Sequence, residues 1–162
     1  MIYLALYQGV GLVSRVHRWL MWSDYSHGAL IQQAAGGGGL NRIEAWAATN
    51  EVREVHNLSE GYEKGTKIDL FEFRFALSET EEAELWRLAR KEVGKKYDFK
   101  GVFSFLLRRR MQDCDKWFCF ELMAEVCKRA GRMLVGLPSW KVAGNLIAGS
   151  VTLKFARRVV VK

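Results

Sequence analysis

Cysteine is scarce in this sequence, and the three residues present, Cys114, Cys119 and Cys127, cannot all pair within one chain. Their spacing is not that of a CxxC motif, and no histidine lies near enough in the sequence to complete a zinc site. We therefore expect free thiols in a reducing compartment, with no metal site and no cofactor.

Proline is rarer still, and Pro138 is the single example. The sequence also contains no evident linker and no internal repeat. With 162 residues, the chain has the length of one domain, which we assign to residues 1–162. The composition, 49% apolar and 27% charged, is typical of a globular protein and argues against disorder. A domain of this length can fold without disulfides or metal ions.

Long uncharged apolar runs are also missing. The apolar segment at the N-terminus is interrupted by Arg15, His17 and Arg18, and no stretch reaches the roughly 18 residues that a membrane span needs. The segment also lacks the regions of a secretory signal peptide. We therefore predict a protein without a transmembrane anchor that is cytoplasmic at synthesis. Any action outside the cell or in a phage particle would need a route other than a Sec signal.

Basic residues outnumber acidic ones: the sequence has 25 Lys and Arg and 18 Asp and Glu, which gives a net charge of +7. A basic surface attracts anionic partners such as nucleic acid, anionic lipid or acidic cell-wall polymers. The excess is concentrated late in the chain, at residues 108–110, 128–129, 132 and 157–158. No helix-turn-helix, zinc-finger or RNP pattern surrounds these residues, so we predict a solvated cationic face and no sequence-specific recognition of nucleic acid.

The hydrophobic periodicity changes between the two halves of the chain. The first half predicts strands at residues 2–7, 26–32, 41–47, 52–55 and 68–75, with a short amphipathic helix near residues 12–20. The second half predicts helices at residues 78–93, 102–107 and 118–130 and a final strand at residues 151–161, with Ser78 and Glu81 as a capping box. Residues 36–39, four glycines, are interpreted as a hairpin loop. This order, with strands in the first half and helices in the second, predicts an α+β fold. We expect a small and mostly antiparallel sheet that packs against helices.

Cys119 is the most informative position for chemistry. It lies at or just inside the start of the helix predicted at 118–130, where Asp113 or Asp115 is available as a cap. The positive end of a helix favours an anion, so a thiol at that place loses its proton more readily. The alternative is a small buried apolar residue, the usual role of a free cysteine, and Cys127 fits that description well. The pattern alone leaves both roles open for Cys119.

His27 is the leading candidate for a base, because it enters a strand directly after a loop and Gly28 leaves space beside it. The competing interpretation is a strand histidine that is hydrogen-bonded to the backbone. We place His17 on the surface of the short helix and His56 at a strand end. On general grounds either of them could replace His27.

Five segments in a fixed order resemble a known family. They are YLALYQG, WSDYSHG, IEA, GKKYDF and WFCFEL, and the resemblance covers roughly residues 3–146. This set resembles the circularly permuted NlpC/P60 superfamily, which includes YiiX/YaeF-like cysteine peptidases and related phage-encoded proteins. Its members place the histidine on a strand before the cysteine-bearing helix, the reverse of papain's order, and this chain has the same order. The resemblance implies a circularly permuted papain-like fold.

The resemblance also implies roles for individual residues. Cys119 corresponds to the family nucleophile and His27 to its histidine, while Glu44, on the strand after His27, corresponds to the third polar residue. A carboxylate there would fix the imidazole tautomer and stabilise the imidazolium. His56 is the reserve candidate for this third role. Tyr97, in GKKYDF, is a candidate for lining the substrate cleft.

Two departures from the family pattern bear on specificity. Phe120 stands directly after the cysteine, where the family commonly has serine, and it would either reshape the substrate cleft or pack below it. The segment 142–145 lacks the proline expected after the helix. Both leave the catalytic pair in place and put the substrate specificity in doubt.

The expected function is that of a cysteine hydrolase. It would cleave an amide bond, in a peptide or a peptidoglycan stem peptide, or an ester bond in an acyl-lipid, through an acyl-enzyme on Cys119 with His27 as general base. The alternative is a non-catalytic binding or structural module, such as a phage or prophage particle component, and Phe120 favours it. Binding of nucleic acid through the cationic face ranks last.

Overall fold

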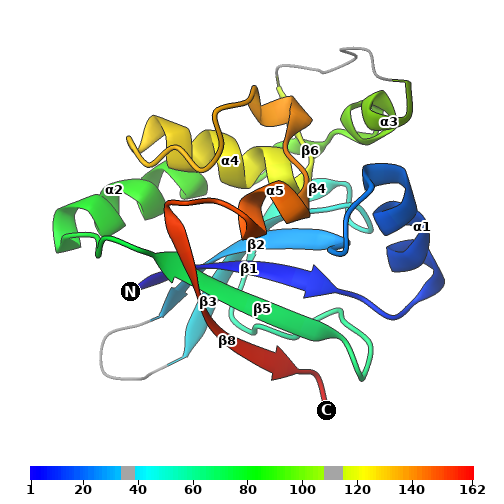
Figure 1. The fold of residues 1–162 in the computed structure, drawn as a ribbon, viewed down its shortest axis with the longest axis horizontal. Helices are drawn as coiled ribbons and strands as arrows, with labels where there is room; N and C mark the ends of the chain where they lie inside the picture. The colour runs from blue at the N-terminus through cyan, green and yellow to red at the C-terminus, as the bar shows by residue number, and fades with distance from the viewer. Residues whose placement is uncertain (34–38, 108–114) are drawn as a thin grey trace.

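One curled, eight-stranded sheet forms the centre of the protein, of which the computed structural model describes residues 1–33, 39–107 and 115–162 (Figure 1). The strand order is β7-β6-β4-β3-β2-β1-β5-β8. Every neighbouring pair is antiparallel except β6 and β7. The strands are β1 (Ile2–Gln8), β2 (His27–Gln33), β3 (Leu40–Trp46), β4 (Glu51–Val55), β5 (Lys67–Phe73), β6 (Lys96–Tyr97), β7 (Lys116–Trp117) and β8 (Leu153–Val160).

The helices gather on one face and at one end of this sheet. Figure 1 shows α2, α4 and α5 over one face, while α1 and α3 lie beyond one end of the central strands. The helices are α1 (Leu12–Met21), α2 (Glu79–Arg90), α3 (Phe99–Leu107), α4 (Cys119–Arg129) and α5 (Gly144–Ala148), with a 3-10 turn, η2, at Ser139–Lys141. Among the described residues, no helix combines the length and the apolar character needed to cross a membrane.

Apolar side chains fill both faces of the sheet, because successive residues of a strand point to opposite sides. On β1, Leu4 and Leu6 join the core under the helices, whereas Ala5 and Tyr7 join a second, smaller core on the other face. On β2, Leu30 belongs to the helix side and Ala29 and Ile31 belong to the other side. By the same alternation, Gly28 faces the helices, and His27 has the orientation of Ala29 and Ile31.

Gly28 allows α4 to lie directly on β2. A β-carbon built at Gly28 would come within 2.5 Å of the Met123 Sδ and 2.9 Å of Cδ1 of Phe120. Both distances are shorter than any van der Waals contact, so a larger residue would push the helix away from the strand. The start of α4 and the start of β2 are therefore held close together.

The α+β class, the mostly antiparallel sheet and all six predicted strands are confirmed, as are the four predicted helices. The capping box of Ser78 and Glu81 is present at the start of α2. The sheet is larger than predicted, because β6 and β7 add two very short strands, and η2 and α5 were not predicted. Residues 36–38 of the predicted glycine loop lie outside the described residues.

The predicted cap of α4 is wrong. Phe118 is the N-cap residue and its side chain makes no capping hydrogen bond, so Asp115 is not the N-cap residue. Asp113 lies outside the described residues. The side chain at the N-cap position therefore does not bind the first N–H groups of α4, which have no acceptor within the helix itself.

Candidate active site

Glu44 is hydrogen-bonded to His27 across two neighbouring strands. The Nε2 atom of His27, the first residue of β2, lies 2.8 Å from Oε2 of Glu44 on β3. Glu44 is fully buried and His27 nearly so. This contact joins two of the three residues that the family resemblance assigned to one site.

Two arginines hold the other oxygen of the same carboxylate. Nη2 of Arg42 lies 2.9 Å from Oε1 of Glu44, and Arg53 donates a hydrogen bond from Nε to this oxygen over 3.0 Å. Arg42 is itself fully buried and donates to the carbonyl oxygens of Leu58 and Glu60 at 2.7 and 2.8 Å. Burial raises the pKa of Glu44, but His27, Arg42 and Arg53 outweigh it and keep the pKa below its ordinary value. Glu44 is therefore a carboxylate at neutral pH.

Cys119 also acts on the imidazole of His27. The charge and the side chain of Cys119 raise the pKa of the ring, and because Glu44 occupies Nε2, Nδ1 is the nitrogen left for an interaction with the sulfur. Burial lowers the pKa of His27, but Cys119 and Glu44 together overcome this effect and raise the pKa to about 9. At neutral pH the ring is an imidazolium, the form that stabilises a neighbouring thiolate.

Aromatic side chains enclose the imidazole. The ring centroids of Trp46 and Tyr7 lie 5.2 and 5.6 Å from that of His27, both in edge-to-face contact. Tyr62 stacks on Tyr7 at 4.2 Å and donates from its hydroxyl to Oε2 of Glu44 over 3.4 Å. Burial raises the pKa of Tyr62 well above its ordinary value, so the phenol remains a donor. The ion pairs at Glu44 therefore lie in a region of low dielectric constant, where they are strong.

Tyr97 also lies near Cys119. It ends β6, which pairs with β7 just before the start of α4. Burial raises the pKa of Tyr97 well above its ordinary value, and the charges of Cys119 and Asp98 raise it further. The phenol is consequently protonated and close enough to Cys119 to be affected by its charge. Its contact with a substrate stays a prediction.

Phe120 packs below the pair. It is fully buried, next to Gly28 of β2 and Gly144 at the start of α5. Of the two outcomes expected for a bulky residue here, packing below the cleft matches this position. Any contact between Phe120 and a substrate stays a prediction.

The other two histidines lie outside this network. His56 is exposed, and its Nδ1 lies 2.7 Å from Oδ1 of Asn41, so it does not occupy the third position that Glu44 fills. The prediction that His17 lies on the surface of the short helix is wrong. Its Nδ1 contacts the carbonyl oxygen of Ser26, and burial lowers its pKa. His17 thus links α1 to the residue before His27.

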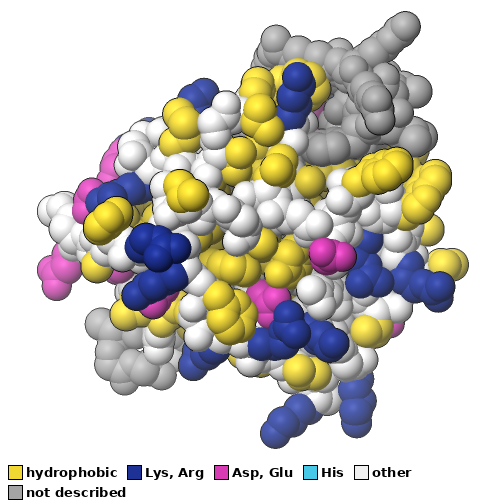
Figure 2. Space-filling view, in the orientation of Figure 1, with side chains coloured by type: hydrophobic (Ala, Val, Ile, Leu, Met, Phe, Trp, Pro, Cys, Tyr) yellow, Lys and Arg dark blue, Asp and Glu magenta, His cyan; other side chains and the backbone are white. Residues whose placement is uncertain are grey.

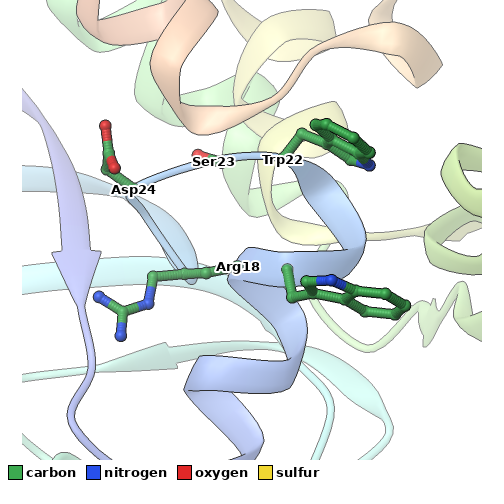
Figure 3. Close-up of a pocket in the computed structure, with 5 residues that line it drawn as sticks. Arg18, Trp22, Ser23 and Asp24 are labelled. Atoms are coloured by element: carbon green, nitrogen blue, oxygen red, sulfur yellow. The ribbon is translucent and has the colours of Figure 1, made fainter.

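The pair is closed in this structure. Cys119 is 0% exposed and His27 is 8% exposed, so the substrate cleft expected from the sequence does not reach the pair in this conformation. A surface hollow lies elsewhere, at the end of α1 (Figure 3). Cys127 is fully buried too, and burial raises its pKa to about 12, so it has the inert character predicted for it. Cys114 lies outside the described residues.

Sequence reasoning missed the groups that hold Glu44. Arg42 precedes Glu44 by two residues on β3, so the period of a strand places both on one face, and this signal was available. Arg53 is opposite Glu44 in the β3–β4 pairing. This contact can be predicted only when the register of the hairpin is known. Tyr62 comes from the loop between β4 and β5, and no local pattern marks it.

Comparison with protein-family models and with curated protein sequences gives no match. Among solved structures, the chain is similar to one described as metalloprotein yiiX from Escherichia coli O157:H7, DUF1105, with a TM-score of 0.69 and 16% sequence identity. The alignment covers 98% of this chain and 96% of that one. The chain therefore shares the fold of yiiX over nearly its whole length.

Proposed function

We propose that the protein is a cysteine hydrolase of the circularly permuted NlpC/P60 type. The proposal depends on one observation: the His27 imidazole is hydrogen-bonded to a buried carboxylate, Glu44, and is close enough to Cys119 for this side chain to raise the pKa of the ring. A cysteine, a base and a group that orients the base are the parts that nucleophilic acyl transfer requires. The fold shared with yiiX agrees with the proposal at the level of architecture alone.

The proposed reaction has two steps. In the first, the Cys119 thiolate attacks the carbonyl carbon of an amide or ester, while the His27 imidazolium gives its proton from Nδ1 to the leaving amine or alcohol. In the second, the now neutral His27 takes a proton from water, and the hydroxide releases the acyl group from the sulfur as a carboxylic acid. Glu44 remains ionised throughout and holds the ring through Nε2.

The start of α4 supplies the place for the oxyanion. The N–H groups of the first turn of a helix have no partner within the helix, and the N-cap residue Phe118 makes no side-chain capping bond here. The backbone N–H of Cys119 then lies beside the carbon that its sulfur attacks, and the positive end of the helix favours the negative oxygen. A substrate must first displace the side chains that cover Cys119.

The substrate class proposed is a peptide, a peptidoglycan stem peptide or an acyl-lipid, since the resemblance covers enzymes acting on amides and on esters. The protein is proposed to meet its substrate after cytoplasmic synthesis, in a phage particle or by export through a non-Sec route. No sequence-specific contact with nucleic acid is proposed.

A metal-dependent reaction is not proposed, although the word metalloprotein describes yiiX. Among residues 1–33, 39–107 and 115–162, no group of three or more His, Cys, Asp or Glu is arranged to hold a metal ion. Glu44 is also surrounded by two guanidinium groups and an imidazolium, and this positive charge would repel a cation.

Alkylation of the intact protein tests the pairing of Cys119 and His27. Iodoacetamide reacts with thiolates, so we expect it to label Cys119 at about pH 6, at a rate set by opening of the site. Cys127 is the internal control, because its raised pKa and its burial should leave it unlabelled. Peptide mass spectrometry reads both sites in one sample. Equal and slow labelling of the two cysteines in the folded protein would refute the proposal.

Activity then provides the second test. Cys119→Ala should abolish hydrolysis of a panel of acyl substrates, whereas Cys127→Ala, a truncation of the same size on the same helix, should keep it. Hydrolysis retained in Cys119→Ala would exclude Cys119 as the nucleophile.

One observation favours a second candidate function. Both members of the pair are covered in this structure, which is also what a non-catalytic binding or structural module with the same fold would show. In that case Cys119 would resist alkylation below neutral pH as Cys127 does, so the labelling experiment separates the two candidates.

A further inference from the structure

The outer face of α1 is apolar and exposed. Most surface helices turn their apolar residues toward the core, but here Met21 is buried and His17 half-buried, while the apolar side chains point outward. The exposed apolar side chains are Leu12 at 74%, Val13 at 82%, Val16 at 48%, Trp19 at 68% and Trp22 at 84%. We call these five residues the α1 surface.

The geometry of the helix aligns these residues in a single band. Leu12, Val16 and Trp19 are spaced at i, i+4 and i+7, which places them one above the other along the helix. Phe99 and Phe103 of α3, which contacts α1, are about half exposed and extend the apolar area. Apolar side chains are also seen at the right edge of the molecule in Figure 2, where Figure 1 places α1.

Positive charge accompanies this apolar band. Arg15 and Arg18 lie on the same helix, which contains no acidic residue, and neither arginine forms an ion pair with any described residue. Dark blue side chains border the apolar ones in Figure 2. Arg18, Trp22 and Asp24 also line the shallow hollow of Figure 3, together with Trp19 and Ser23, and Nδ2 of Asn145 donates to the Asp24 carboxylate over 3.2 Å.

We propose that the α1 surface binds to an anionic lipid bilayer. Tryptophan prefers the boundary between headgroups and acyl chains, where its ring is in apolar surroundings and its N–H can still meet polar groups. Arginines beside such a band attract lipid phosphates, and the net charge of +7 acts in the same direction. A helix with exposed Trp and Val residues and adjacent Arg residues has the composition of an interfacial helix that lies flat on the membrane.

Docking through α1 would place the candidate active site near the lipid. His17 on the inner face of α1 contacts the carbonyl oxygen of Ser26, and the next residue is His27. The docking is independent of the proposed hydrolase chemistry, so Cys119→Ala should bind membranes as the unaltered protein does.

Vesicle cosedimentation tests the proposal. Vesicles of phosphatidylglycerol and phosphatidylcholine should bind the protein, and vesicles of phosphatidylcholine alone should bind it far more weakly. Trp19→Ser with Trp22→Ser should weaken binding to the anionic vesicles by at least about tenfold, because two large apolar side chains no longer enter the lipid. The control is Phe75→Ser with Val151→Ser, which removes two comparably exposed apolar side chains far from α1 in sequence and should leave binding unchanged.

Charge is tested separately. Arg15→Gln should weaken binding to anionic vesicles by about fivefold, and Lys91→Gln, an exposed cation on the turn after α2, should have little effect. Since both substituted positions are exposed, circular dichroism should show unchanged folding. Unchanged binding in the tryptophan variant would overturn the proposal, as would equal binding to neutral vesicles. A dimer in light scattering that the tryptophan substitutions dissociate would also overturn it, because a second copy would then cover this surface.

Discussion

Glu44→Gln should strongly destabilise the fold, whatever the protein's activity. The substitution keeps the size of the side chain and removes its charge, so Arg42, which is fully buried, loses the anion that compensates it. Arg53 and the His27 imidazolium lose the same partner. Removing one member of a buried ion pair costs about 3–5 kcal/mol, because the remaining charge stays in a region of low dielectric constant. We expect a loss of about this size in the free energy of unfolding.

Urea denaturation followed by circular dichroism measures this quantity, and the midpoint and the slope should be compared with those of the unaltered protein. Glu54→Gln is the matched control. Glu54 lies on β4, next to Arg53, and pairs with the exposed side chain of Arg90 at 2.8 Å. An exposed pair contributes at most about 1 kcal/mol, so the control should lose little.

The comparison of the two variants decides the outcome. A loss below about 1 kcal/mol in Glu44→Gln, or equal losses in both variants, would refute the view that the Arg42–Glu44–Arg53 cluster is a buried charge network. A second measurement, the His27 titration by NMR, should show a lower pKa in Glu44→Gln, because the carboxylate helps to raise it.

Three further predictions follow from the same region and from α2. The imidazolium of His27 is favoured in the folded state by a pKa raised from 6.5 to about 9, so its stabilising contribution is complete below pH 6.5 and is lost as the pH rises through 9. This contribution, about 3 kcal/mol, should be absent in His27→Gln, as unfolding measured across this pH range would show. Gly28→Ala should cost about 1–3 kcal/mol, because the new methyl group meets Met123 and Phe120 and pushes α4 away from β2. Ser78→Ala should lower the free energy of unfolding by about 1 kcal/mol, because it removes the cap of α2. Thermal denaturation should show this as a lower midpoint temperature.

Each of these three has a result that contradicts it. Parallel pH profiles for the unaltered protein and His27→Gln would mean that the histidine does not titrate as described. A Gly28→Ala variant as stable as the unaltered protein would show that Met123 and Phe120 move aside freely. For Ser78→Ala, Ser59→Ala is a control that substitutes a partly exposed loop serine, and an equal loss there would exclude a specific capping effect.

The main elements could be predicted because their signals are local. The alternation in 68–75 and the capping box at Ser78 and Glu81 specify a strand and a helix without reference to the rest of the chain. The two-residue strands β6 and β7 carry no such period, since two residues cannot show one. They exist because Tyr97 and Trp117 meet at the edge of a sheet that is already formed.

The candidate site could be predicted only in part, for a similar reason. Sequence order and resemblance brought Cys119, His27 and Glu44 together, but the contacts of Arg53 and Tyr62 depend on strand register and on a loop. The predicted solvated cationic face is also incomplete: Arg129 pairs with Glu92 and Glu125, Arg132 with Glu81, and Arg158 with Asp69. Ion pairs between residues far apart in the sequence require knowledge of the tertiary fold.

The complete burial of Cys119 affects how fast oxidants can modify this residue. Peroxide attacks thiolates, and it must touch the sulfur to convert it to sulfenic and then to sulfinic acid. A sulfur with no exposed surface is shielded from this damage for as long as the covering side chains stay in place. The fraction of Cys119 oxidised after a timed exposure to peroxide would therefore record how often the interior opens to a small molecule.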